Sequence, residues 1–216
     1  METRAARGEG EPDFLKSLRP PYRSYPTGGG GPGPRRYQLA SNGVIAMVIF
    51  IIAEAMFFAG LISAFTIGKT TAIGGWPPPG QPRLPVQETA FNTAALLLSG
   101  LFMVLAHRGF ASRPGAARRP LLLSILLGSF FVLFQGVEWV ALIREGLTLT
   151  TSTHGAFFYL IVGAHALHAV AAIAALIYIY TRLIGGRSTP SEFKTAGLFW
   201  YFVVGLWPIL YWRVYL

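Results

Sequence analysis

Five long stretches that carry little or no charge most constrain what this 216-residue chain can fold into. A transmembrane helix needs about 20 mostly apolar residues to cross ~30 Å of hydrocarbon. Three of the stretches exceed that length, and the two shorter ones reach it with their polar flanks. The stretches are Gly43–Ile67, Thr89–Ala106, Pro120–Ile143, Gly155–Thr181 and Thr195–Trp212.

Helices suit these stretches better than strands do. Strands of a membrane barrel run for about ten residues and alternate in polarity, which these stretches do not. A helix satisfies all its backbone groups internally, as hydrocarbon requires. The composition agrees, because 53% of the residues are hydrophobic and 12% are charged, against about a quarter charged in soluble domains. The sequence therefore predicts an all-α, polytopic membrane bundle of five transmembrane helices.

The chain is expected to divide into two parts. Residues 1–37 are rich in glycine, proline and arginine and contain the run GGGGPGP at 28–34. Such a segment cannot bury enough apolar surface to pack, so we expect a disordered cytoplasmic tail. Residues 38–216 form the membrane domain. The absence of cysteine excludes disulfides, thiolate zinc sites and cysteine nucleophiles.

The basic residues predict an orientation. Fourteen of the 18 lysines and arginines lie in the tail, the 107–120 loop and the 182–194 loop, and four lie on the opposite side. Basic residues accumulate on the cytoplasmic side of a membrane. We therefore expect a cytoplasmic N-terminus, an external C-terminus and location in the cell inner membrane. The net charge of +9 is explained by topology and lipid contact, and it does not indicate a nucleic-acid partner.

Four ionisable side chains inside the spans are the candidate functional groups. Glu54 lies near the midplane of the first span, and Glu138 lies near the outer end of the third, on one face with Gln135. His165 and His168, three residues apart, are expected to share one face near the middle of the fourth span, at a depth similar to that of Glu54. Charged groups at such depth are costly and are expected to be neutral, paired or hydrated.

Two interpretations of these groups stay open. They form a buried cluster that exchanges protons, or they form hydrogen-bonded pairs that hold helices together. A zinc or iron site is disfavoured, because the sequence lacks an HExxH pattern and further carboxylates around the histidines. We also find no catalytic constellation, phosphate-binding loop or dinucleotide fingerprint. We therefore assign no catalytic residue, no metal ligand and no bound cofactor to this chain.

Several motifs together resemble subunit III of haem–copper oxidases, the cytochrome c oxidase subunit III family. They are IIAEAMFFAG at 51–60, WPPPG at 76–80, LPVQETAFNTAALLLSG at 84–100, QGVEW at 135–139 and THGAFFYLIVGAHALH at 153–168. The resemblance runs from about residue 36 to residue 216. It is to the five-helix form of the family, which lacks the first two of seven helices.

The resemblance implies an accessory subunit of a respiratory terminal oxidase without a catalytic centre of its own. Such a subunit packs against subunit I, supports its proton uptake and holds phospholipids, while haem and copper belong to partner subunits. It also implies which residues matter. The intramembrane polar positions are carried over as Glu54, Glu138, His165 and His168, and the basic lipid-facing position as Arg182.

Four positions depart from the family pattern. Tyr201 and Val204 replace a histidine and an aspartate of the last helix, Lys194 replaces a glutamate, and Ser63 replaces a tryptophan. Such changes fit a divergent branch or a relative that serves another respiratory complex. The alternatives are therefore an accessory protein of a nitric oxide reductase and, from a different class, a small proton-coupled transporter.

Overall fold

The structure is a computed structural model that describes residues 41–72, 76, 84–150 and 152–215. The chain divides into two units, Met1–Leu39 and Ala40–Leu216, and all described residues belong to the second. The predicted tail, residues 1–37, lies outside the described residues. So do residues 77–80 of the WPPPG motif.

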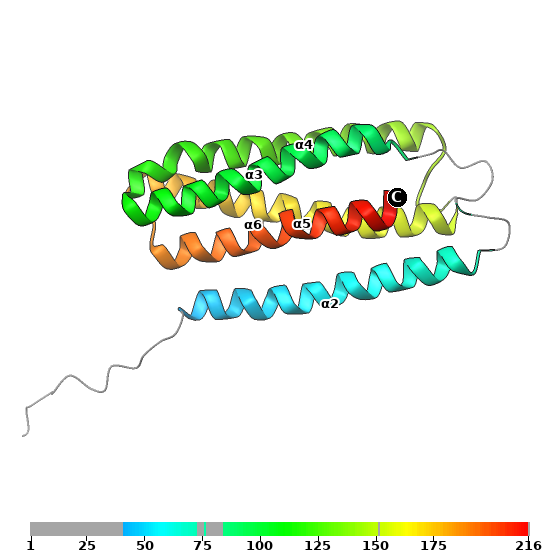
Figure 1. Cartoon of the computed structure of the whole chain (residues 1–216), viewed down its shortest axis with the longest axis horizontal. Coiled ribbons are helices and arrows are strands. Elements are labelled where there is room, and N and C mark those ends of the chain that lie inside the picture. The colour runs from blue at the N-terminus through cyan, green and yellow to red at the C-terminus, as the bar shows by residue number, and fades with distance from the viewer. Residues whose placement is uncertain (1–40, 73–75, 77–83, 151, 216) are drawn as a thin grey trace, which may run out of the picture. The chain divides into compact units, whose positions relative to one another are not determined.

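Five long helices make up the described part of the chain, which contains no strand, and each is long and apolar enough to cross a membrane. The prediction of an all-α protein with five such helices is thus confirmed. Figure 1 shows them as α2 (Asn42–Thr70), α3 (Val86–Ser112), α4 (Arg118–Arg144), α5 (Thr153–Ile184) and α6 (Pro190–Leu210). A 3-10 turn, Pro114–Ala117, links α3 to α4, and a π-helical turn, Tyr211–Tyr215, continues α6.

Helix α6 begins at Pro190, earlier than the expected span at Thr195. The cause is a capping box that the hydropathy pattern does not register. The backbone N–H of Glu192 donates to Thr189 Oγ1 at 3.2 Å, and Glu192 Oε2 accepts from the backbone N–H of Thr189 at 3.1 Å. Proline at the first helical position adds to this start, because its missing N–H would be unpaired there in any case.

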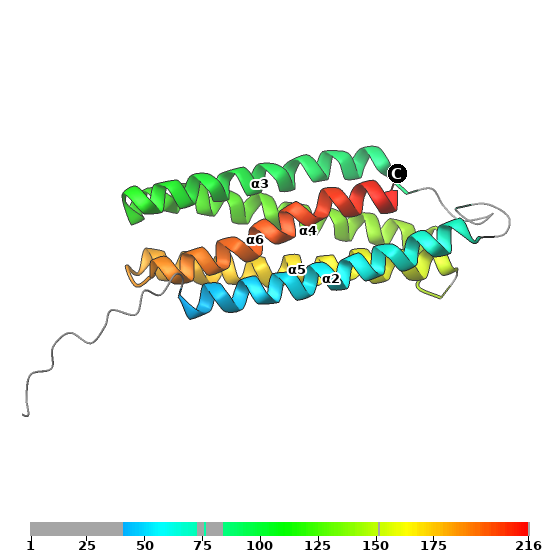
Figure 2. The ribbon, with the colours of Figure 1, turned by 60° about the horizontal axis from the view of Figure 1, so that its bottom comes forward.

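Helix α6 is the centre of the bundle. It packs against α2, α3 and α5, and Figures 1 and 2 show it running along the inside of the other helices. Trp200 and Trp207 are among its fully buried side chains. The indole N–H of Trp207 donates to Thr93 Oγ1 at 2.8 Å, which ties α6 to α3.

Two glycines let neighbouring helices pack against α6. A Cβ at Gly128 of α4 would lie 2.6 Å from Trp200 Cη2, and a Cβ at Gly100 of α3 would lie 2.8 Å from Val204 Cγ1. Both distances are shorter than van der Waals contact allows. Val204, one of the positions that depart from the family pattern, is therefore packed against α3 as a buried apolar side chain.

Helix α2 lies at the edge of the bundle and carries Glu54. Within α2, all of which the structure describes, only Phe58 and Phe65 are buried. Figure 2 shows the helix running along one side of the bundle, next to α5. Its outward apolar surface is what a bilayer or a membrane partner would cover. The large exposed apolar residues of α2 are Ile45, Val48, Ile49, Phe50, Ile52, Met56, Phe57 and Ile67.

Candidate functional site: polar side chains inside the membrane spans

Glu54 of α2 and His168 of α5 form a direct pair. Glu54 Oε2 lies 3.1 Å from His168 Nε2, and the two side chains are 21% and 15% exposed. The ring of Phe58 lies edge-on to the imidazole at 5.5 Å, and Phe199 is edge-on at 6.3 Å. Aromatic rings thus flank the Glu54–His168 pair, but this chain leaves part of the pair exposed.

The hydrogen bonds of His168 determine how many protons the pair holds. His168 Nδ1 lies 2.7 Å from the carbonyl oxygen of Ala164. A carbonyl only accepts, so Nδ1 carries a proton. The contact between Nε2 and Glu54 then needs one further proton, either on the carboxyl group or on the imidazole. In both forms the pair has no net charge, which lowers the cost of placing it inside a membrane.

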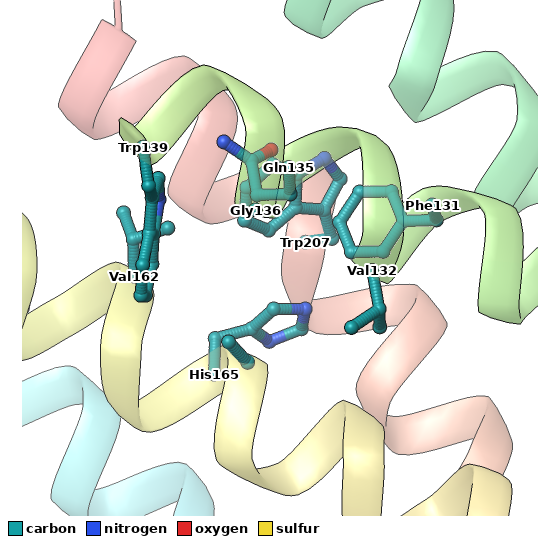
Figure 3. A pocket seen from close by; sticks show the side chains of 9 residues that line it. Phe131, Val132, Gln135, Gly136, Trp139, Val162, His165 and Trp207 are labelled. Carbon is teal, nitrogen blue, oxygen red and sulfur yellow. The ribbon is translucent and has the colours of Figure 1, made fainter. Parts of the chain in front are cut away.

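His165 lies apart from that pair although it is only three residues away. Its imidazole is 1% exposed and points toward α4 and α6, as Figure 3 shows. Trp207 lies 5.0 Å from the ring and Phe131 lies 6.4 Å from it. Among the described residues neither ring nitrogen has a hydrogen-bond partner.

Glu138 belongs to a third group of side chains, between α3, α4 and the C-terminal turn. Its Oε2 accepts hydrogen bonds from Gln135 Nε2 at 2.9 Å and from Thr89 Oγ1 at 3.1 Å. Gln135 Nε2 also donates to the hydroxyl oxygen of Tyr215 at 3.1 Å. Glu138 is buried, and its Oε1 has no partner within the described part of the chain. Gln135 and Glu138 do share a helical face, and their side chains meet.

The four intramembrane residues therefore occupy three places. The structure brings Glu54 and His168 together, whereas no hydrogen bond or ion pair between described residues joins either of them to His165 or Glu138. His165 lies three residues before His168 on α5, but its side chain points toward α4 and α6. The described residues also contain no group of three His, Cys, Asp or Glu side chains placed to hold a metal ion.

Arg182, in the last turn of α5, forms an ion pair and hydrogen bonds with other groups of the protein. Its guanidinium lies 3.3 Å from Glu192 Oε1 and donates to the hydroxyl of Tyr178 at 3.1 Å and to the carbonyl of Arg187 at 2.9 Å. The side chain is still about a third exposed. Glu192 therefore both caps α6 and holds Arg182.

Sequence reasoning also missed a polar contact between α3 and α6. His107 Nδ1 of α3 lies 3.0 Å from the hydroxyl of Tyr201 of α6, and the two rings are stacked with their centroids 5.7 Å apart. Tyr201 had been noticed only as a departure from the family pattern. The position of His107 at the polar end of a span was the available signal. The sequence does not show which neighbouring helix that face of α3 contacts.

Fold and polar groups together define a class of protein. The chain is a multi-pass helical membrane protein with intramembrane polar pairs at helix contacts. Two of these pairs join different helices, Glu54 of α2 with His168 of α5 and Thr89 of α3 with Glu138 of α4.

Comparison with known proteins identifies the family. A family model described as cytochrome c oxidase subunit III matches residues 36–216. A probable cytochrome c oxidase subunit 3 of Nocardia farcinica is 29% identical over 177 residues, covering 79% of this chain and 86% of the relative. The subunit 3 of Gallus gallus is 34% identical over 178 residues, covering 78% and 67%. That of Mycobacterium leprae, also named as probable, is 32% identical over 179 residues, covering 79% and 86%.

The chain belongs to the cytochrome c oxidase subunit III family. It is an accessory subunit of a haem–copper oxidase and works in a complex with other oxidase subunits. The resemblance that the sequence motifs indicated is thus confirmed, and the oxidase interpretation is favoured over the transporter and the nitric oxide reductase partner.

Proposed function

We propose that this chain packs against subunit I of a terminal oxidase in the cell inner membrane. There it supports the stability, proton uptake and lipid contacts of subunit I during aerobic electron transport. It binds no haem or metal itself, and the haem and copper of the complex reside in partner subunits. Its N-terminus faces the cytoplasm.

The Glu54–His168 pair carries this proposal. A polar pair near the middle of a span is costly wherever it meets hydrocarbon. Glu54 is about one fifth exposed on the most peripheral helix, and α2 presents a broad apolar surface on both sides of it. Covering the pair with a neighbouring protein removes that cost. The family supplies the neighbour, a catalytic oxidase subunit.

Phospholipid is the second proposed contact, at Arg182. Its partly exposed guanidinium lies at a helix end with Arg187 and Arg118 near it in the fold. Basic groups at the cytoplasmic end of a span attract anionic lipid headgroups. We propose that the exposed part of Arg182 binds a lipid phosphate while Glu192 holds the side chain in place.

A crosslinking experiment tests the proposed partner. Phe57 lies three residues from Glu54 on the same face of α2, whereas Leu133 of α4 is also exposed but lies on a different helix. With a photo-reactive benzophenone residue at position 57, we expect covalent capture of a haem-containing subunit, identified by mass spectrometry. The same residue at position 133 is the matched control and should capture that subunit much less.

The same preparations test the proposed absence of cofactors. A tagged chain should co-purify with a haem protein in mild detergent and carry no Soret absorbance after it is separated from its partners. Equal capture at both positions would contradict the proposed interface. A Soret band that stays with the separated chain and disappears on His165 or His168 substitution would contradict the accessory role.

The proposed orientation predicts the location of reporter fusions. In Figure 1 the starts of α2, α4 and α6 lie at one end of the bundle, and the C-terminal end of α6 lies at the other. We expect fusions at Arg118 and Arg187 to be cytoplasmic, and fusions at Pro79 and Leu216 to be external, because the basic loops lie at the first end. Paired alkaline phosphatase and green fluorescent protein reporters give opposite signals at each site. A cytoplasmic C-terminus would refute the orientation.

A further inference from the structure

A groove follows the seam between α3 and α4, the two neighbouring helices at the top of Figure 1. Its deeper part is a hollow of about 370 Å³ that is lined by apolar side chains of both helices. They are Phe91, Ala94, Ala95, Leu98, Leu127 and Phe130. Phe91 is 65% exposed and Phe130 is 42% exposed, so the hollow opens sideways, to where the hydrocarbon of a bilayer would lie.

A second hollow, of about 310 Å³, continues the seam toward the end of the bundle. Its walls include Glu88 of α3, Phe134 of α4 and Glu145, which directly follows α4. The rings of Phe134 and Phe130, one from each hollow, lie 5.8 Å apart. Glu88 and Phe91 are three residues apart and therefore share one face of α3. The two hollows thus form one groove with an apolar body and a charged end.

The length of the groove corresponds to one leaflet of a bilayer. Glu88 at the charged end and Leu98 in the apolar body are separated by about 15 Å along α3, at 1.5 Å per residue. The hydrocarbon of a bilayer is ~30 Å thick, so one leaflet contributes about half of that. An acyl chain in the apolar hollow would therefore hold its headgroup near Glu88. A transmembrane helix of a partner would need a contact surface along the whole span, so the groove favours a lipid.

The charged end of the groove carries both signs. Glu88 and Glu145 are exposed, and within the described part of the chain neither forms an ion pair. Arg144 borders an adjoining hollow that shares Val137 and Ala141 with the groove, and it forms no ion pair with a described residue either. Carboxylates accept hydrogen bonds from an ammonium group, and an arginine binds phosphate. The ammonium and the phosphate of one zwitterionic headgroup complement these three charges.

We propose that this groove binds an aminophospholipid of the phosphatidylethanolamine class. One acyl chain lies in the apolar hollow. The ammonium group donates to Glu88 and Glu145, and the phosphate contacts Arg144. A choline headgroup has no N–H to donate, and a glycerol headgroup has no positive charge, so neither matches both signs. The site lies at the opposite end of the bundle from Arg182, which is in the last turn of α5, and it does not depend on the oxidase role.

Native mass spectrometry of the full chain, purified in detergent and freed of lipid, tests the proposal. The chain is titrated with phosphatidylethanolamine, phosphatidylcholine or phosphatidylglycerol, all with the same acyl chains. We expect one saturable site that prefers the ethanolamine lipid over the choline lipid by about threefold to tenfold, the effect of one hydrogen bond. Binding of the glycerol lipid should depend on Arg182 and not on Glu88.

Variants locate the site. Glu88→Gln combined with Glu145→Gln keeps the size of both side chains and should abolish the preference for the ethanolamine lipid. Glu192→Gln, at the opposite end of the bundle, is the matched control and should keep the preference, because glutamine also serves in a capping box. Ala94→Phe fills the apolar hollow and should weaken binding of the ethanolamine lipid at least threefold. The same change at Ala171, an exposed position of α5, should leave that binding unchanged.

Four outcomes would each overturn the proposal. They are non-saturating binding, equal affinity for the ethanolamine and choline lipids, a preference that survives the double glutamine variant, and unchanged binding in Ala94→Phe. The first of them is also the result expected if the groove receives a helix of a partner in place of a lipid.

Discussion

Replacing Gly128 by alanine should destabilise the bundle by about 1–3 kcal/mol, the usual cost of overpacking a close-packed interior. The new Cβ would lie 2.6 Å from Cη2 and 2.7 Å from Cζ2 of Trp200, a side chain with no exposed surface into which to move. The same substitution at Gly136, on the same helix, meets no atom within 4 Å. We expect it to leave stability unchanged or slightly higher, because alanine favours a helix over glycine.

The assay is unfolding of the purified chain in mixed micelles at increasing denaturing detergent, followed by tryptophan fluorescence. A second substitution locates the cause. Cη2 and Cζ2 belong to the outer ring of the indole, and a phenylalanine side chain at position 200 would not extend that far. Trp200→Phe should therefore recover part of the stability lost in Gly128→Ala. Equal effects at Gly128 and Gly136, or additive effects of the two changes, would mean that the α4–α6 contact is not as described.

The second large effect is expected at the Glu54–His168 pair, measured in the assembled complex. Glu54→Ala should leave the initial rate of oxygen reduction largely intact, because the proposed role assigns the reacting groups to partner subunits. Assembly with subunit I, or endurance during sustained turnover, should suffer. The remaining His168 Nε2 loses its partner 3.1 Å away and keeps its desolvation cost, about 1–3 kcal/mol. The yield of co-purified complex and the decay of the rate with turnover number are the measurements.

Two further variants separate structural pairing from proton exchange. Glu54→Gln retains an N–H that can donate to His168 Nε2, so a structural role predicts a milder defect than alanine causes. Glu54→Leu combined with His168→Leu removes both polar groups and should restore assembly toward the wild type. If glutamine is as harmful as alanine and the defect changes with pH, the carboxyl group exchanges protons. Loss of initial activity in a fully assembled Glu54→Gln complex would contradict the accessory role itself.

The spans were predictable because hydrocarbon thickness demands long apolar helices whatever their neighbours are. The residues at which the helices begin and end were less predictable. The hydropathy pattern begins the last span at Thr195, but α6 starts at Pro190. Polar residues form the cap there, and the Thr189–Glu192 spacing that marks it is a sequence signal of a different kind. The family was also readable from motifs, because those motifs combine several spans and a loop.

The arrangement of the polar groups was only partly predictable. Position along a helix gives the depth of a side chain in the membrane, which places Glu54, His165 and His168 at similar levels. It does not give the direction in which the side chain points. Three residues correspond to about 300° of turn, so His165 and His168 diverge by about 60°. That divergence lets His168 pair with Glu54 on α2 while His165 faces the side chains of α4 and α6.

The sequence by itself therefore determined that this chain is a five-helix membrane protein, which family it belongs to and which residues are polar at depth. All three depend on residue type and spacing along the chain. Only the tertiary structure decided which polar groups meet. Pairing depends on how each helix is rotated against its neighbours, and that rotation is set by contacts such as Gly128 with Trp200, which join residues far apart in sequence.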